Sequence, residues 1–256
     1  MWKPDGWDAR VRIGVLVPHA DVGPESELRA MAPPEVGIHG TRAFFGAMAP
    51  GGTMDPTIAL QPVRAFAEPP HIDAAAELLA AAPVDAIGVG FTSHAYVIGA
   101  AAEAAMVARL EGVTRGIPVV SPGLAARDAL RALGAQRILL VHPPWFDAEL
   151  QDLGRAYFAA AGAEVLQSAS AELPSDQRAI TPEGLHAWVI GQLPEGAEAV
   201  VIGGNGFRAV GAIAALEEST GRPVITANQV LLWAALRAAE DEPPRIAGYG
   251  RLFDAR

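Results

Sequence analysis

Short apolar runs rich in valine and isoleucine alternate along the chain with longer stretches rich in alanine and leucine. Short apolar runs bounded by turn residues are typical of strands buried on both faces, and the longer stretches show helical spacing. The predicted strands are Val11–Val17, Val36–Arg42, Ala86–Gly90, Pro118–Ser121, Arg137–Val141, Ala163–Ser168, Ala199–Gly203 and Pro223–Thr226. The predicted helices are Glu25–Ala32, His71–Ala82, Ala100–Glu111, Gly123–Leu133, Asp147–Ala161, Pro182–Gln192, Ala209–Thr220 and Gln229–Ala239.

This alternation predicts the fold class. Buried strands connected by helical crossovers form parallel sheets with helices on both faces. Gly134, Gly162 and Gly221 each follow a predicted helix, where glycine commonly ends a helix. We therefore expect an α/β fold built from doubly wound parallel sheets.

Three segments of the first half of the chain recur in the same order in the second half. The pairs are 12–18 with 137–143, 85–90 with 198–203, and 117–121 with 222–226. The repeat predicts two pseudo-symmetric halves that face each other across a cleft: an N-terminal half at 1–120 and a C-terminal half at 121–256, whose last helix crosses back. The N-terminal half carries a Gly/Pro-rich insertion at 49–70, too long for an ordinary connection and expected to form a lid or a disordered flap.

Composition narrows the function classes. The chain is 51% hydrophobic and only 19% charged, which suits a packed core. A formal net charge of −10 without a basic cluster argues against nucleic-acid binding. No apolar run is long enough to cross a bilayer, and the opening residues 1–6 do not resemble a signal peptide. We expect a cytoplasmic protein without a membrane partner, and the alanine-rich helices are compatible with a homo-oligomer.

The chain contains no cysteine. Disulfides, thiolate metal ligands and cysteine nucleophiles are therefore excluded. Any proton transfer or nucleophilic step must use another side chain.

Polar and aromatic residues follow the predicted strands. Ligands of parallel sheets bind beyond the carboxyl ends of the strands, so these residues are the candidates for a site. They are His19, Asp21, Phe91, Thr92, Ser93, His94, Tyr96, His142, Trp145, Gly204, Asn205 and Gly206. Three of the six histidines of the chain are in this set. Because an imidazole titrates near neutrality, we predict that His142, His94 or His19 transfers a proton, with His142 the first choice. Asp21 is predicted to orient a histidine.

The other candidates suit binding rather than proton transfer. Thr92 and Ser93, and the amides of Gly204–Gly206, could donate hydrogen bonds to a carboxylate or to a developing oxyanion. Phe91, Tyr96 and Trp145 indicate an apolar or aromatic ligand.

Four segments resemble a known family. They are Pro18–Glu25, His39–Arg42, Thr92-Ser93 and Asn228–Trp233. They are similar to motifs of the aspartate/glutamate racemase superfamily, in particular its maleate cis-trans isomerase and arylmalonate decarboxylase branch. The resemblance covers nearly the whole chain. It implies two pseudo-symmetric α/β halves with the active site between them.

The chain departs from the family at the residues that usually carry the chemistry. The resemblance places the two family cysteines at Phe91 and Gly204, and the asparagine that binds the substrate carboxylate at Asp21. Racemisation by two cysteines is excluded. The anion-binding residues Thr92, Ser93 and Gly204–Gly206 are retained.

The leading hypothesis is a cysteine-independent isomerase or decarboxylase-like lyase. It would act without a cofactor on a small carboxylate or carbonyl compound, through an oxyanion-stabilised, enolate-like intermediate. One alternative is a metal-dependent enzyme with His19, Asp21, His94 and His142 as ligands. The other is a member of the superfamily that binds a small ligand without catalysis.

Overall fold

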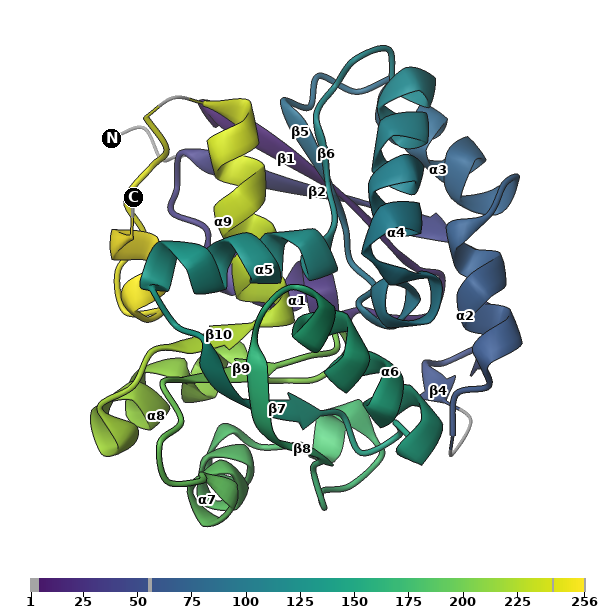
Figure 1. Cartoon of the computed structure of the whole chain (residues 1–256). Coiled ribbons are helices and arrows are strands. Elements are labelled where there is room, and N and C mark those ends of the chain that lie inside the picture. Colours follow the sequence, from purple (N-terminus) through teal and green to yellow (C-terminus); the bar gives the residue numbers. More distant parts are fainter. Residues whose placement is uncertain (1–4, 55–56, 241, 256) are drawn as a thin grey trace.

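Two four-stranded parallel sheets form the framework of the protein (Figure 1). The computed structural model describes residues 5–54, 57–240 and 242–255, so part of the opening segment 1–6 lies outside the described residues. The first sheet has the order β2-β1-β5-β6 and the second the order β10-β9-β7-β8. Their strands are β1 Val11–Pro18, β2 Val36–Ala43, β5 Ala86–Val89, β6 Val119–Val120, β7 Arg137–His142, β8 Glu164–Ser170, β9 Ala199–Ile202 and β10 Val224–Thr226.

The two sheets are related by the internal repeat. Read from the other edge, the second sheet has the order β8-β7-β9-β10, which corresponds strand by strand to β2-β1-β5-β6. Each of the three repeated segment pairs falls on such a pair of strands: β1 with β7, β5 with β9, and β6 with β10. The predicted α/β fold with two pseudo-symmetric parallel sheets is confirmed.

Helices cover the sheets, and every predicted helix is present. Their bounds are α1 Gly23–Met31, α2 Leu60–Ala67, α3 His71–Leu79, α4 Ser93–Val113, α5 Pro122–Leu133, α6 Ala148–Ala160, α7 Pro182–Gln192, α8 Ile213–Thr220 and α9 Ala227–Ala239. The first turns of α4 were not predicted. Gly99, with φ of +79°, interrupts this helix, and the predicted start at Ala100 is its second part.

The last long helix returns to the first sheet. Helix α9 follows β10 of the second sheet but packs against β5, β6 and β1 of the first, and against α5 (Figure 1). Gly88 of β5 permits this approach, because a Cβ at this position would lie 2.9 Å from Leu231. The two halves are thereby held together. The boundary between residues 120 and 121 stays a prediction.

The described residues of the insertion at 49–70, which are 49–54 and 57–70, include regular secondary structure. They contain most of a short antiparallel hairpin, β3 Met48–Ala49 with β4 Thr53–Met54, and helix α2. Val63 and Phe66 of α2 are buried, and the helix packs against α4. The burial of these side chains stabilises a helix that the surrounding glycines and prolines obscure in the sequence.

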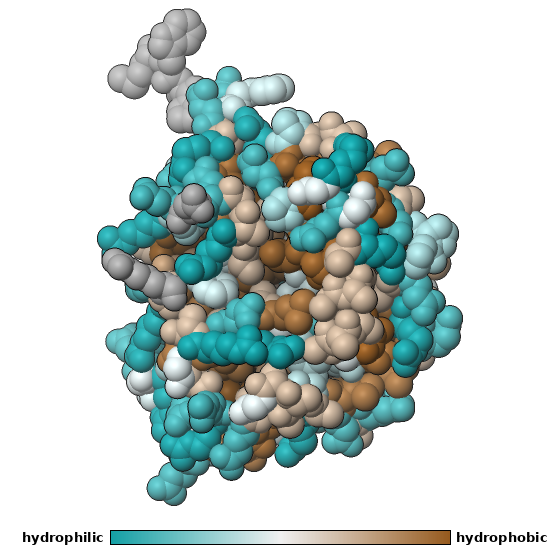
Figure 2. All heavy atoms as spheres, turned by 45° about the horizontal axis from the view of Figure 1, so that its top comes forward, coloured by the Kyte–Doolittle hydropathy of each residue, from teal (hydrophilic) through white to brown (hydrophobic). Residues whose placement is uncertain are grey.

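No helix in the described ranges is long and apolar enough to cross a membrane. In the face shown in Figure 2, hydrophobic residues gather toward the middle and hydrophilic residues cover much of the edge.

Candidate functional site

A small cavity lies where the two sheets face each other. Its volume is only about 20 Å³, enough for about one water molecule. The lining residues come from the segments after β1, β2, β5, β7, β8 and β9: Pro18, Asp21, Phe45, Met48, Ile58, Phe91, Thr92, Ser93, Trp145, Phe146, Gln177, Gly204, Asn205 and Gly206. A substrate can enter only if this wall opens.

Backbone amides line two sides of this cavity. Thr92 and Ser93 begin α4, and Gly204–Gly206 form the equivalent turn after β9. Within the described ranges, the amides of these five residues have no hydrogen-bond acceptor in the protein. The positive end of the α4 dipole adds to them. Together they can bind a carboxylate or an oxyanion.

The turn after β9 has no room for side chains at two positions. Gly204 has φ of +90°, and a Cβ on it would overlap the ring of Pro143. A Cβ on Gly206 would lie 2.8 Å from Asp21 Oδ2 and would overlap the Gln177 side chain. The backbone of the turn is therefore what a ligand can contact.

In the described part of the chain, Asp21 is the one titratable side chain that lines the cavity. It is 4% exposed, and its Oδ1 accepts a hydrogen bond of 2.8 Å from the Gly23 amide. Burial raises the pKa of Asp21 to about 6, although hydrogen bonds from Gly23 and Gln177 oppose the shift. These partners are not histidines, so the structure does not show the predicted role of Asp21 in orienting a histidine.

The three candidate histidines do not line the cavity. His19 accepts a hydrogen bond of 3.2 Å at Nδ1 from the Phe45 amide, and its ring stacks on Phe44. It lies beside the wall of the site and supports the segment that follows β2.

His94 belongs to a buried polar network behind the first amide group. Its Nδ1 donates to the Phe91 carbonyl, and its Nε2 lies 3.2 Å from Ser121 Oγ. Ser121 in turn donates to Glu103, which also accepts from Tyr157. Burial lowers the pKa of His94. These contacts fix the turn that carries Phe91 and the amide of Thr92.

His142 is completely buried. Its Nε2 lies 2.9 Å from Ser168 Oγ, and its Nδ1 has no partner in the described part of the chain. The ring packs between Tyr96 and Phe146, and burial lowers its pKa to about 3. A neutral imidazole without access to the cavity is poorly placed to exchange protons with a substrate.

The alternative metal site is not formed. Among residues 5–54, 57–240 and 242–255, no group of three or more His, Cys, Asp or Glu side chains could hold a metal ion. His19, His94 and His142 have separate partners, and only Asp21 reaches the cavity. The described residues therefore do not form the alternative metal site of His19, Asp21, His94 and His142.

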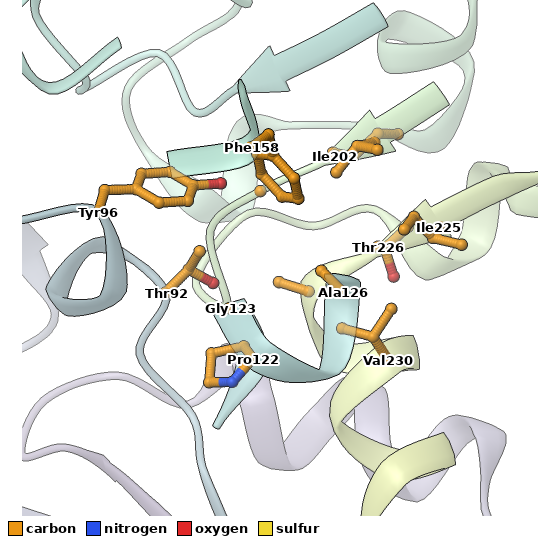
Figure 3. Close-up of a pocket in the computed structure, with 13 residues that line it drawn as sticks. Thr92, Tyr96, Pro122, Gly123, Ala126, Phe158, Ile202, Ile225, Thr226 and Val230 are labelled. Atoms are coloured by element: carbon orange, nitrogen blue, oxygen red, sulfur yellow. The ribbon is translucent and has the colours of Figure 1, made fainter. Parts of the chain in front are cut away.

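The aromatic candidates divide into two groups. Phe91 and Trp145 line the cavity, and Phe91 packs against Phe45 with ring centroids 4.7 Å apart. Tyr96 instead faces a separate gap of about 10 Å³ behind Thr92 (Figure 3). The walls of this gap are mostly apolar, so Tyr96 belongs to the interface between the halves.

A groove of about 470 Å³ adjoins the cavity. Gln177, Asn205 and Gly206 line both spaces. Gln177 lies in a short 3₁₀ turn after β8, Gln177–Ala179, and sequence analysis did not single it out. Its hydrogen bond with Asp21 and its place between groove and cavity are set by tertiary structure alone.

Sequence comparison identifies two kinds of relatives. Residues 67–253 match the model of a family described as arylmalonate decarboxylase. A maleate isomerase of Pseudomonas putida is 28% identical over 253 residues, which cover 94% of this chain and 96% of that protein. An arylmalonate decarboxylase of Bordetella bronchiseptica is 26% identical over 176 residues, 64% of this chain and 68% of that protein.

Solved structures have the same fold. A variant of the maleate isomerase Iso from Pseudomonas putida S16, solved with maleate, superposes with a TM-score of 0.82 at 25% identity and covers 96% of this chain and 98% of that one. A liganded double mutant of arylmalonate decarboxylase has a TM-score of 0.78 at 22% identity and covers 95% of this chain and 99% of that one.

Proposed function

This chain belongs to the arylmalonate decarboxylase family, and we propose that it decarboxylates a small malonate-type acid without a cysteine. The expected class, an isomerase or decarboxylase, agrees with relatives that are a maleate isomerase and an arylmalonate decarboxylase. The observation that carries the proposal is the place of Asp21. Among the described residues, it is the only ionisable side chain on the wall of a cavity that is also lined by unpaired backbone amides.

The amides at the start of α4 and in the turn after β9 bind the carboxylate that remains in the product. When the bond to the second carboxylate breaks, its electron pair moves through the α-carbon into the bound carboxylate, and carbon dioxide leaves. The resulting enediolate carries its charge on the two oxygens that face the amides. Donors held in place for this charge lower the barrier.

Asp21 then donates its proton to the α-carbon of the enediolate and becomes a carboxylate. The C–H bond forms as the O–H bond of Asp21 breaks, and a proton from water restores the acid. A carboxyl with a pKa of about 6 retains its proton over part of the neutral range, as a general acid requires. The protonated form also avoids repulsion with an anionic substrate.

The lining favours decarboxylation over isomerisation. The chain has no cysteine, and the described residues around the cavity include no lysine, arginine or histidine. Rotation about a carbon–carbon double bond needs a nucleophile to add to it, and this wall offers no strong one. A second carboxylate would meet apolar surface from Phe45, Phe91 and Trp145, which disfavours its charge and favours its departure as neutral carbon dioxide.

Proton NMR in D₂O with arylmalonates and maleate as probes tests the proposal. We expect the wild type to release a monocarboxylic acid with deuterium at the α-carbon from an arylmalonate, and to leave maleate unchanged. Asp21→Asn should lower kcat by at least about 100-fold, the usual size of a general-acid contribution. His142→Leu is the matched control and should retain activity.

Two results would contradict this assignment. Turnover that persists in Asp21→Asn would remove Asp21 from the mechanism, and turnover lost only in His142→Leu would restore the histidine hypothesis. Ligand-induced shifts without turnover would instead identify a protein that binds its ligand without catalysis.

A further inference from the structure

A buried carboxylate next to the site has no part in the proposed reaction. Glu27 of α1 is 8% exposed. Its Oε1 accepts from the amides of Ala209 (2.6 Å) and Val210 (3.0 Å), and its Oε2 accepts from Asn228 Nδ2 at 2.7 Å. Burial raises the pKa of Glu27 to about 7, while these donors favour the charged form. Glu27 thus joins the N-terminal half to the loop after β9.

The contacts of Glu27 continue as a chain of hydrogen bonds to the cavity. Asn228 Nδ2 also donates to the Asn205 carbonyl at 2.8 Å. Asn205 Nδ2 donates to Asn228 Oδ1 at 2.7 Å, and Thr92 Oγ1 donates to Asn205 Oδ1 at 2.6 Å. Asn205 and Asn228 are at most 3% exposed. Asn228 lies in the Asn228–Trp233 segment, whose role the proposed reaction leaves open.

The hydrogen bond between Asn228 and Glu27 determines which group donates and which accepts at each later step of this chain. With Glu27 in its charged form, a reversed Asn228 amide would place its oxygen against two acceptors, Glu27 Oε2 and the Asn205 carbonyl. Buried acceptors without donors are costly, so Asn228 keeps its NH₂ group toward Glu27. Asn205 must then turn its NH₂ group toward Asn228. The side-chain oxygen of Asn205 then faces Thr92, so the single hydroxyl proton of Thr92 is used in the hydrogen bond to Asn205.

We infer that Glu27 is a positioning residue: through Asn228 and Asn205 it directs the Thr92 hydroxyl proton away from the substrate and sets the spacing of the two amide groups. The catalytic consequence rests on the proposed function. Thr92 then contributes its amide to the oxyanion, not its hydroxyl. Ser93, which also lines the cavity, carries the second hydroxyl at this place.

Glu27→Gln tests the inference, because the new side chain has one acceptor where Glu27 has two. Either the Ala209 and Val210 amides or the Asn228 amide must lose its partner. We expect the side-chain amide protons of Asn205 and Asn228, observed by NMR without substrate, to shift and to exchange faster with solvent. With an arylmalonate as substrate, kcat should fall about 10- to 100-fold with a smaller change in KM.

In the double variant Glu27→Gln/Asn228→Asp, the new amide at 27 donates to the new carboxyl group at 228. In its protonated form this carboxyl group donates to the Asn205 carbonyl and accepts from Asn205 Nδ2, so each hydrogen bond regains a donor and an acceptor. We expect the kcat of the double variant to be at least about tenfold higher than that of Glu27→Gln. A merely structural role of Glu27 would not produce this recovery. Glu217→Gln is the control. Glu217 is equally buried, at 8% exposed, and accepts from the Val224 and Arg251 amides, which take no part in this chain of bonds.

Unchanged amide signals of Asn205 and Asn228 in Glu27→Gln would overturn the inference. Wild-type kcat in this variant, or a double variant no better than the single one, would overturn it as well. The NMR measurement needs no substrate, so it tests whether the hydrogen-bond chain exists even if the wild type fails to turn over an arylmalonate. Failure of the proposed function is therefore distinguishable from failure of this inference.

Discussion

The ring of Pro143 occupies the space that a side chain at Gly204 would need. Gly204 is the position that the family resemblance assigns to the second cysteine, and its φ of +90° favours glycine. Pro143 follows β7 and Gly204 follows β9, two neighbouring strands of the second sheet. The packing of Pro143 against Gly204 leaves no room for a thiol side chain at this position, so a single substitution would not place one in this geometry.

Gly204→Ala should destabilise the protein more than Gly162→Ala. Both glycines have φ near +90°, but a Cβ on Gly162 meets no atom within 4 Å. Strain at a positive φ costs about 1–2 kcal/mol in each variant. Overlap with Pro143 adds roughly 1–3 kcal/mol at Gly204 only. Urea unfolding of both variants measures the difference, and equal losses would show that Pro143 moves freely.

Asp21→Asn should make the protein more stable at high pH. Folding raises the pKa of Asp21 from 3.8 to about 6, so the folded state binds more protons between these values. The wild type therefore loses about 3 kcal/mol as pH rises from below 4 to above 6. The variant cannot ionise and avoids this loss. Its stability relative to wild type should increase by most of that amount between pH 4 and pH 8, as measured by urea unfolding.

The surface variant Asp152→Asn controls for the change in net charge in that experiment. A stability difference between Asp21→Asn and wild type that stays constant from pH 4 to pH 8 would argue that Asp21 is not buried as described.

The rate of product formation should fall as pH rises above about 6. Only protonated Asp21 can donate to the enediolate, and the fraction of this form decreases tenfold per pH unit well above its pKa. The dependence of kcat on pH between 5 and 9 provides the measurement. A rate that instead rises through this range would identify Asp21 as a base and would favour proton abstraction over decarboxylation.

His142→Leu should resist acid better than the wild type. An unperturbed histidine has a pKa of 6.5, and burial lowers the pKa of His142 to about 3 in the folded protein, so the unfolded state binds a proton first as pH falls. This difference removes roughly 3 kcal/mol of wild-type stability between neutral pH and pH 4. At neutral pH the variant loses the hydrogen bond to Ser168, worth about 1 kcal/mol.

Acid titration followed by circular dichroism compares the two proteins. Unfolding of both at the same pH would mean that His142 is not the buried neutral group that limits acid stability.

Much of the fold could be predicted from the sequence, because hydrophobic periodicity is a local property of the chain. The strands of both sheets and the repeat that relates them were read from runs such as Arg137–Val141. Helix α2 was missed because its stability depends on packing against α4, and the start of α4 was missed because Gly99 interrupts its pattern.

The candidate site was only partly predictable. The strand ends were correctly placed at the edge where the halves meet, but a strand end does not determine where its side chain points. Successive side chains of a strand face opposite sides of the sheet. His142 points toward α6, where a Cβ on Gly154 would lie 2.7 Å from its ring, and not toward the cavity.

The sequence alone determined that no thiol takes part, that two similar α/β halves are present, and that Asp21, Thr92 and Gly204 lie near their junction. Tertiary structure decided which of these groups share a cavity, which are buried, and to which side the Thr92 proton points. The physical reason is the separation along the sequence between the residues that interact. Periodicity and composition act over neighbouring residues, whereas burial, pKa and hydrogen-bond direction depend on contacts such as Glu27 to Asn228, which lie 201 residues apart in the chain.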